Sequence, residues 1–462
     1  MSQAVSSTPS STPDRVSAPY PAPAIAWYAT IVLAVLYWVS ILDRFIISLL
    51  VDPIKRDLNI TDVQFSLLHG LGFALTFAIF GFVLGILADR LARRWVIYAG
   101  VTVWSLATAA CGFAQQFWHL LLARVGVGVG EAALQPCASS MIADLFPREK
   151  LTSAMAVYAM GSTVGGGCAF FFGGMIVDWV SHTNAIVLPL IGELRSWQAV
   201  FLIVGVPGLF LALLIFTLPE PVRRGLRAGQ VLNEEPNKRS WRSAYGDLFK
   251  FMSTRRKFFA CHYVAFTFAS AVLSGTGAWY PAHMGRTFGW SGSQIGLALG
   301  IVLTVSGFIA QSMCGRVVDS MVRRGSRDAQ FRYYAICLLL ATPIGIVATA
   351  SANPWVFVGG IGLYLVFFSS LSAYAATALN LVTPNELRGT GMALYAGTAG
   401  LVGISCGPIL IALAAKLFEG PASLGYGMAI VIGIGLPVAA LFLALGFRAM
   451  RDAVAEAETW AN

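Results

Sequence analysis

Residues 120–136 read LLLARVGVGVGEAALQP and place Arg124 and Glu131 inside an apolar run that is long enough to cross a bilayer. The two charges are seven residues apart, which is about two turns of helix, so both lie on one face and differ in depth by roughly 10 Å. Charges inside a membrane usually face the protein interior or a wet cavity. We therefore expect this face to line the working cavity, while the three glycines between the charges let another helix approach closely.

The composition is that of a polytopic membrane protein. The 462 residues are 57% hydrophobic and only 11% charged, whereas about a quarter of the residues in soluble domains are charged. The seven cysteines show no metal-ligand spacing and are interpreted as small packing residues. Membrane topology explains the net charge of +9 better than a nucleic-acid partner does, and we predict no such partner.

Apolar runs of spanning length occur twelve times, and each can form a helix through about 30 Å of hydrocarbon. We predict an all-α integral membrane protein with twelve transmembrane helices in two six-helix bundles. The first six runs lie near residues 27–50, 66–88, 96–114, 118–142, 152–178 and 198–218. The second six lie near residues 258–283, 292–319, 331–350, 355–380, 390–416 and 425–450.

The predicted organisation has five parts, because polar segments flank and separate the two groups of runs. They are a disordered N-terminal tail (1–24, rich in Ser and Pro), an N-terminal bundle (25–218), a basic cytoplasmic linker (219–257), a C-terminal bundle (258–450) and a C-terminal tail (451–462).

The distribution of Lys and Arg predicts the orientation. The even-numbered loops and both tails carry 24 of the 31 basic residues, and the odd-numbered loops carry five. Because basic residues concentrate on the cytoplasmic side, both termini should be cytoplasmic. In a cell with a single membrane this predicts a multi-pass protein of the plasma (inner) membrane, although an organelle membrane would satisfy the same rule.

The two halves of the chain repeat each other. GILADRLARR at 85–94 matches GRVVDSMVRR at 315–324 in its Gly, its Asp and its Arg pair. Repeated halves are a transporter architecture with the substrate site at mid-depth between them. The stretch between the fourth and fifth runs also matches the stretch between the tenth and eleventh: Pro147, Glu149, Met155, Ala156 and Tyr158 correspond to Pro384, Glu386, Met392, Ala393 and Tyr395.

The repeated loop predicts a cytoplasmic latch that holds one conformation. Asp89 ends the second run and can pair with the arginines that follow it. The alternative is an ordinary basic cytoplasmic loop. The predicted latch residues are Gly85, Asp89, Arg90, Arg93 and Arg94 with Asp319, Arg323 and Arg324.

Four charges are expected to form a cluster inside the membrane. The first run goes outward and the fourth inward, so Asp43 and Arg124 lie at similar depth and are natural partners. Arg44 adds a second cation, and Glu131 lies near the midplane. Two carboxylates that share two arginines in a low-dielectric cavity can couple protonation to conformation. The alternative is a permanently paired structural cluster.

The second half holds almost no charge within its runs but many aromatic residues, which would suit lipid tails. Ordinary packing is the simpler explanation for any one of them. The candidate cavity residues are Tyr158, Tyr263, Phe266, Tyr280, Tyr364, Phe368, Tyr374 and Tyr395. Four histidines without a sequence partner are interpreted as structural, namely His69, His119, His262 and His283. We predict no metal site.

The twelve runs, the long central loop and the 85–94 motif together resemble the major facilitator superfamily from about residue 27 onward. One position departs, because the family usually has Gly where this chain has Ala92. Arg124 and the glycines after it also resemble the family motif that is linked to proton coupling. A glycine run at 161–174 resembles the antiporter motif only loosely, since Gly166 stands where that motif has Pro.

A narrower resemblance rests on LDRFIISLLVDPIKRDL at 42–58 combined with RVGVGVGEAALQP at 124–136. Together these stretches resemble the spinster-like subfamily. The resemblance implies a proton-coupled carrier of lipid-like substrates such as lysophospholipids or sphingoid phosphates.

We predict a secondary active transporter that is driven by protons and works by alternating access, with Asp43 and Glu131 exchanging protons while Arg44 and Arg124 compensate charge. The expected partners are a small amphipathic or lipid-like substrate and the membrane lipids. Protons are the coupling ion, no cofactor is expected, and the protein should be a monomer. No phosphate loop of the G-x-x-x-x-G-K-[ST] type occurs.

Three alternatives stay open at this point. The first is a proton-coupled exporter or importer of another small organic solute or drug. The second is a uniporter or lipid scramblase whose charges only set the gate. The third, a membrane enzyme that acts on a lipid head group through two carboxylates, is disfavoured by the internal duplication, so we predict that the chain is not an enzyme.

Overall fold

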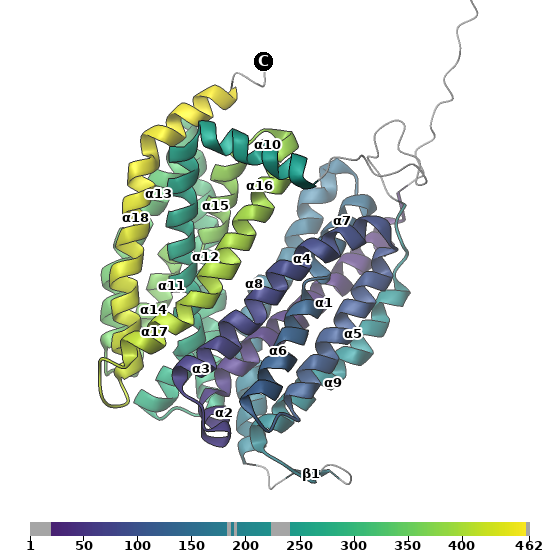
Figure 1. Ribbon diagram of the computed structural model, residues 1–462, viewed down its shortest axis with the longest axis vertical. Helices are drawn as coiled ribbons and strands as arrows, with labels where there is room; N and C mark the ends of the chain where they lie inside the picture. Colours follow the sequence, from purple (N-terminus) through teal and green to yellow (C-terminus); the bar gives the residue numbers. More distant parts are fainter. Residues whose placement is uncertain (1–19, 183–185, 189–191, 223–240, 459–462) are drawn as a thin grey trace, which may run out of the picture.

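The structure, a computed structural model, describes residues 20–182, 186–188, 192–222 and 241–458. Two bundles of long helices stand side by side, the N-terminal one in purple to blue and the C-terminal one in teal to yellow (Figure 1). The predicted N-terminal tail as far as residue 19, and residues 223–240 of the predicted linker, lie outside the described residues.

The N-terminal bundle contains six spans, three of which are built from more than one helical piece. In chain order its elements are α1 (Pro23–Leu49), the short α2 (Val51–Leu58), α3 (Asp62–Ser66) with the π-helical turn η1 (Leu67–Leu71) and α4 (Gly72–Arg90), α5 (Arg93–Cys111), α6 (Phe117–Glu131) with α7 (Leu134–Leu145), α8 (Arg148–Ser181), and α9 (Ser196–Leu213) with the 3₁₀ turn η2 (Leu214–Thr217). A hairpin of β1 (Ile186–Leu188) and β2 (Gly192–Leu194) joins α8 to α9.

The C-terminal bundle also contains six spans, and a further helix lies across one end of it. That helix is α10 (Trp241–Thr254), followed by α11 (Arg256–Phe288), α12 (Gly292–Arg323), α13 (Ala329–Ala350), α14 (Pro354–Phe368) with α15 (Leu371–Val382), α16 (Asn385–Thr398) with the π-helical turn η3 (Ala399–Ile404) and α17 (Ser405–Ala415), and α18 (Ser423–Glu458).

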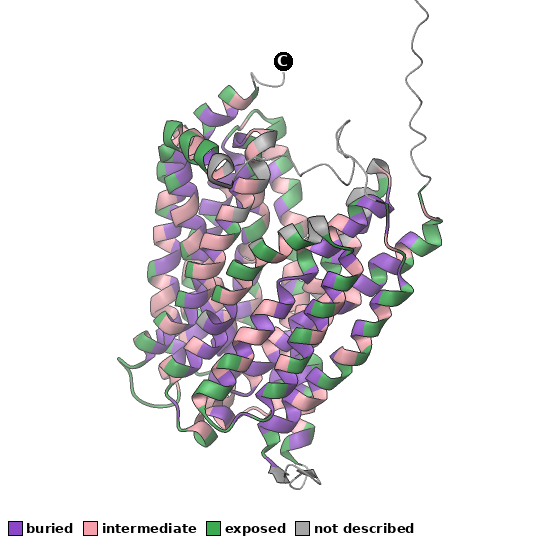
Figure 2. Ribbon diagram, turned by 45° about the vertical axis from the view of Figure 1, so that its right-hand side comes forward, coloured by how far each residue is buried: buried purple, intermediate pink, exposed green. Residues whose placement is uncertain are grey.

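The surface of the two bundles is that of a membrane protein. Eleven of the twelve spans are long and apolar enough to cross a membrane; the twelfth, α5, has 19 residues and begins with Arg93 and Arg94. Exposed residues occur along the sides of both bundles (Figure 2). Many of them are large and apolar, such as Phe308, which is 73% exposed, and Phe210, which is 69% exposed. The predicted all-α, twelve-helix integral membrane fold is confirmed, with the β1–β2 hairpin as a small addition.

Two spans are broken at corresponding places in the two halves. The fourth span is interrupted between Glu131 and Leu134, and the tenth between Phe368 and Leu371. The turns η1 and η3 interrupt the second and eleventh spans, which contact each other across the bundle interface. Discontinuous helices typically form the mid-depth sites of secondary transporters. The breaks therefore direct attention to the region between the bundles.

Glycines bring the two bundles into close contact along α8 and α12. A Cβ on Gly174 would lie 2.2 Å from the carbonyl oxygen of Gly292, and one on Gly296 would lie 2.3 Å from that of Phe170. Neither position can hold a larger residue unless the backbones move apart. Gly174 belongs to the loosely matching antiporter motif, and here it serves helix packing.

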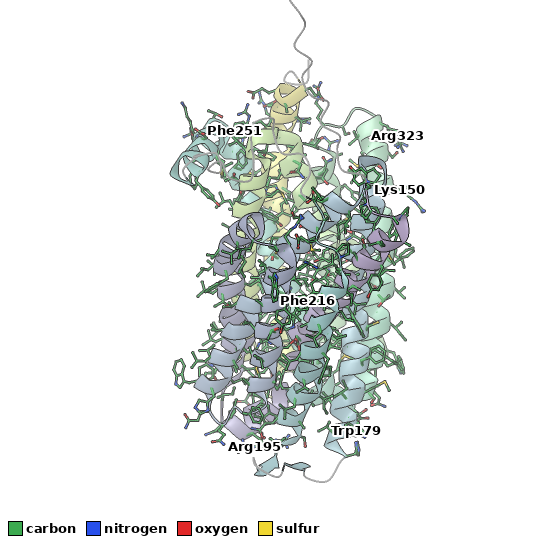
Figure 3. All side chains as sticks on the ribbon, turned by 90° about the vertical axis from the view of Figure 1, so that its right-hand side faces the viewer. Lys150, Trp179, Arg195, Phe216, Phe251 and Arg323 are labelled. Atoms are coloured by element: carbon green, nitrogen blue, oxygen red, sulfur yellow. The ribbon has the colours of Figure 1, made fainter. Side chains whose placement is uncertain are left out.

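The molecule has two distinguishable ends. Figure 3 shows Arg323, Lys150 and Phe251 at the end where α10 and the C-terminus lie, which we call the linker end, and Arg195 and Trp179 at the opposite, far end. Helix α18 continues through Glu458 at the linker end, so the predicted C-terminal tail is helical over most of its length.

Candidate functional site

An ion pair between the first and fourth spans lies at the centre of the intramembrane charges. Arg44 Nη2 donates to Glu131 Oε2 at 2.6 Å, and the Ser40 hydroxyl donates to the same oxygen at 2.8 Å. The Glu131 side chain has no exposed surface, whereas that of Arg44 is 27% exposed. Glu131 is the last residue of α6, where the span breaks, so this carboxylate lies at an irregular point of the backbone.

Asp43 and Arg124 are neighbours but do not form the predicted side-chain pair. Arg124 Nη1 donates to the main-chain oxygen of Asp43 at 3.3 Å. Both Asp43 carboxylate oxygens are buried without a hydrogen bond, and the Thr108 hydroxyl is a polar group close to them. The two residues do share a depth, as predicted. The pairing differs because α1 directs the carbonyl of Asp43, rather than its carboxylate, toward the guanidinium.

Phe73 of α4 lies between the two intramembrane cations, Arg44 and Arg124. The Arg44 Cζ atom is 4.7 Å from the centre of the Phe73 ring, and the Arg124 Cζ atom is 5.7 Å from it. Arg44 is also 5.3 Å from the centre of the Phe77 ring. A ring in contact with a guanidinium stabilises the cation through its negative face. Sequence reasoning missed both phenylalanines, because an apolar run gives no signal that distinguishes them from lipid-facing residues.

His69 lies in η1 beside this cluster. Its Nδ1 is 3.4 Å from the Ser48 hydroxyl, its side chain is buried, and both Arg44 and Arg124 act on it electrostatically. The sequence interpretation of His69 as a structural residue took no account of these arginines. Its position in a π-helical turn next to the charged groups is the signal that only the structure supplies.

A cavity of about 370 Å³ lies between the two bundles. Arg44, Phe73 and Phe77 line it from the N-terminal bundle, and Tyr395 and Leu371 line it from the C-terminal bundle. Its wall is therefore mostly apolar and aromatic, with one guanidinium. Such a wall can accommodate a molecule with an apolar body and a negatively charged group.

Tyr395 is the one predicted cavity aromatic among the described residues that line this space. The others pack inside the bundles in ring contacts, such as Phe266 against Tyr334 at 5.6 Å and Tyr374 against Tyr334 at 4.5 Å. Among the other predicted aromatics, Tyr158 stacks on Tyr37, Tyr280 packs against Phe357, and Tyr364 packs against Phe368; all of these predicted residues are buried. Tyr263 is half-buried and packs against Tyr395.

Two arginines of the first predicted latch, Arg93 and Arg94, contact carboxylates within the N-terminal bundle. Arg93 Nη1 is 2.5 Å from Asp144 Oδ2, and Arg93 Nε is 3.0 Å from Glu220 Oε1. Arg94 donates its main-chain N–H to Glu220 Oε2 at 3.1 Å. Sequence reasoning missed Asp144 and Glu220 as partners. The side chains of Asp89 and Arg90 lie outside the described residues, so the role of Asp89 stays a prediction.

The second predicted latch is not closed in this conformation. Asp319, Arg323 and Arg324 are exposed at the linker end, and the described part of the chain offers them no ion pair. The two copies of the repeated motif, residues 85–94 and 315–324, therefore lie in different surroundings. Gly85 has open space around its Cα, with no atom within 4 Å of an added Cβ.

The two bundles are tied together at the far end by a cluster that was not predicted. Arg286 at the end of α11 lies 2.6 Å from Asp52 and 3.0 Å from Asp62, and Lys55 also pairs with Asp62. The Trp279 indole donates to the Pro408 carbonyl at 3.0 Å inside the C-terminal bundle, beneath this cluster. At the linker end, the ion pairs that the structure describes stay within one bundle. Among the described residues, ion pairs therefore join the two bundles at the far end only.

Comparisons with known proteins agree with this architecture. The Major Facilitator Superfamily profile matches residues 33–408. A protein described as an MFS-type efflux pump from Mycolicibacterium smegmatis is 26% identical over 392 residues, covering 85% of each chain. Protein spinster homolog 1 from Rattus norvegicus is 25% identical over 405 residues, covering 84% of this chain and 73% of the relative.

Solved structures share the fold. A bacterial homolog of the human lysosomal transporter spinster, in an inward-facing and unoccupied conformation, superposes with a TM-score of 0.74 at 23% identity and covers 94% of this chain and 98% of that one. A D-xylose-proton symporter superposes with a TM-score of 0.67 at 16% identity, covering 90% and 97%.

Proposed function

The chain belongs to the major facilitator superfamily, in which it resembles the spinster-like members, and is a transporter rather than an enzyme. From this premise we propose that it couples the movement of protons to the movement of an amphipathic, lipid-like solute. The observation that carries the proposal is the ion pair between Arg44 and the buried Glu131, because Arg44 also lines the cavity between the bundles.

Two carboxylates support proton coupling, Glu131 within this pair and Asp43 beside it. Glu131 is compensated by Arg44, whereas Asp43 has two buried oxygens without a hydrogen bond. A buried carboxyl group without a partner is less costly in its neutral form. In this conformation the unpartnered Asp43 carboxyl group is therefore the candidate proton carrier, and Glu131 is paired with Arg44. When the bundles rock and Arg44 withdraws, Glu131 becomes the group that takes up a proton, so protonation and conformation are linked.

The substrate class follows from the cavity wall. A phosphate group would contact the Arg44 guanidinium, and an acyl chain would lie against Phe77, Leu371 and Tyr395. Lysophospholipids and sphingoid phosphates have this combination of groups. Among the relatives, the one named hexuronate transporter, from Bacillus subtilis, favours the second candidate, another small organic anion.

The orientation follows from the basic loops. We place both termini and the linker end in the cytoplasm, in the plasma (inner) membrane, because 24 of 31 basic residues lie in that set of loops and tails. In this orientation the Arg286 cluster lies on the outer side, which supports an inward-facing conformation. The transporter works as a monomer and needs no cofactor other than the protons.

The test is uptake into proteoliposomes under an imposed pH gradient. Lysophosphatidylglycerol, sphingosine phosphate, glucuronate and a cationic drug are offered in parallel, each with and without a protonophore. Accumulation of a lysolipid or sphingoid phosphate that stops when the gradient collapses supports the proposal. Equal uptake with the protonophore would identify a uniporter or scramblase, and preference for glucuronate would replace the substrate class.

A further inference from the structure

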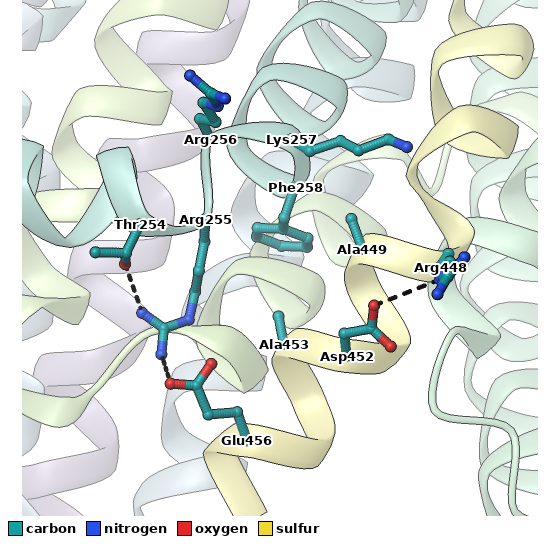
Figure 4. Close-up of a pocket in the computed structure, with 10 residues that line it drawn as sticks. All are labelled: Thr254, Arg255, Arg256, Lys257, Phe258, Arg448, Ala449, Asp452, Ala453 and Glu456. Atoms are coloured by element: carbon teal, nitrogen blue, oxygen red, sulfur yellow. Dashed lines mark hydrogen bonds and ion pairs between the residues drawn. The ribbon is translucent and has the colours of Figure 1, made fainter.

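A second, basic pocket opens at the linker end of the C-terminal bundle, apart from the transport cavity. It has a volume of about 480 Å³ and lies where α10, α11 and α18 meet (Figure 4). Its charged lining residues are Arg255, Arg256, Lys257, Arg448, Asp452 and Glu456.

The positive charge of this basic pocket is only partly compensated. Arg255 forms an ion pair with Glu456, and Arg448 lies 3.9 Å from Asp452. Arg256 and Lys257 are exposed, and Figure 4 draws no interaction for either of them among the residues that line the pocket. With four cations and two carboxylates, two positive charges stay available to a ligand.

The backbone and the neighbouring side chains favour an anion at this place. Arg256 is the first residue of α11, a helix of 33 residues, and the free N–H groups of its first turn add to the positive potential. Phe258 and Ala449 supply apolar wall next to the charges. A phosphate group fits both features, because arginine and lysine bind its oxygens through charge-assisted hydrogen bonds.

The basic pocket also adjoins the lipid-facing surface of α18. Leu441 is 55% exposed and Leu445 is 52% exposed. They stand seven and three residues before Arg448, so all three side chains share one face of the helix. An acyl chain can lie along these leucines while its head group reaches the cations. We propose that the basic pocket binds the phosphate group of an anionic membrane lipid.

Helix α10 gives this site a second contact with the bilayer surface. Leu248 of α10 is fully buried against the bundle, whereas Phe249 is 55% exposed and Lys250 is exposed. The helix therefore presents an aromatic ring and a cation outward, as helices that lie at a membrane surface do. Lipid in the basic pocket would anchor the junction between the linker and α11.

The experiment measures lipid binding to the delipidated full-length protein by native mass spectrometry. Phosphatidylglycerol is titrated against the parent, against the pocket pair Arg256→Gln with Lys257→Gln, and against the control pair Lys150→Gln with Arg316→Gln. The control pair removes two exposed cations from the same end of the molecule but outside the pocket. The pocket pair should bind phosphatidylglycerol roughly thirtyfold more weakly, while the control pair should change binding by less than about threefold.

Further arms identify the source of the phosphate. Phosphatidylcholine should not occupy the site, and glycerol phosphate should not displace phosphatidylglycerol at comparable concentration. The exchange Arg256→Lys with Lys257→Arg keeps both charges and should retain binding, which separates charge from folding defects. Equal loss in the pocket and control pairs, equal binding of phosphatidylcholine, or displacement by glycerol phosphate would each overturn the assignment to an anionic lipid.

Discussion

Arg44 contacts Glu131 at 2.6 Å and at the same time forms part of the wall of the cavity between the bundles. The same guanidinium can therefore compensate either the buried carboxylate or an anionic group in the cavity. Because an uncompensated buried charge is costly, binding of Arg44 to an anionic group in the cavity affects its ion pair with Glu131. This relationship gives a physical route by which substrate binding and protonation influence each other.

Glu131→Gln should remove the proton switch while leaving substrate binding intact. Glutamine imitates the protonated carboxyl group, so the balance of conformations should stay near its low-pH position, and accumulation driven by a pH gradient should be lost. Spin labels at Lys150 and Val322, which are exposed on the two bundles at the linker end, report the distance as pH is varied. If the distance distribution of the variant still titrates like that of the parent, the proton is carried elsewhere, and Asp43 is the next candidate.

Arg44 and Glu131 should be strongly coupled in a double-mutant cycle. Arg44→Gln leaves a buried carboxylate unpaired and should destabilise the protein by about 3–5 kcal/mol, whereas Arg44→Gln combined with Glu131→Gln should recover much of that loss. Thermal unfolding in detergent gives the four stabilities.

The cycle of Arg124→Gln with Asp43→Asn is the matched comparison for that pair. Arg124 binds the Asp43 carbonyl rather than its carboxylate, so the coupling should be weaker there. A larger coupling for Arg124 with Asp43 than for Arg44 with Glu131 would show that the carboxylates exchange partners during the cycle.

Phe73→Leu should weaken the positions of both arginines while preserving an apolar side chain. The ring is 2% exposed and contacts two guanidinium groups, each contact being worth about 1–2 kcal/mol when desolvated. We expect lower thermal stability and a loss of gradient-driven uptake. Phe77→Leu, which removes a ring near Arg44 alone, is the control and should have the smaller effect; equal effects would show that bridging the two cations is unimportant.

Arg286→Gln should loosen the far end of the molecule. The change removes the ion pairs to Asp52 and Asp62 that join the bundles, and it should shift the conformational ratio toward opening on that side by roughly tenfold. Labels at Trp118 and Leu417, exposed on the N-terminal and C-terminal bundles, measure the opening.

Arg195→Gln is the control for the Arg286 variant. Arg195 lies at the same end, but its partner Asp57 belongs to the same bundle at 3.7 Å, so its loss breaks no contact between bundles. An Arg286→Gln protein whose label distances match those of the Arg195→Gln protein would mean that the ion pairs do not hold the far end closed.

The sequence by itself determined the number of spans, the duplication and the depth of the intramembrane charges. Hydropathy and the cost of burying charge act on each segment separately, so twelve runs and the exceptional positions of Asp43, Arg44, Arg124 and Glu131 can be read without tertiary information. The resemblance carried by residues 85–94 and 124–136 then indicated the superfamily, which the match over residues 33–408 confirmed.

Only the tertiary structure decided which of these groups meet. The rotation of α1 and the break after Glu131 direct Arg44, rather than Arg124, to a carboxylate, and neither can be derived from helical spacing. The far-end cluster of Arg286 joins residues more than two hundred positions apart. Of the eight aromatic residues predicted to line the cavity, Tyr395 is the one that does so among the described residues. The sequence could not identify it, because the direction of a side chain depends on how its helix is rotated against the neighbouring helices.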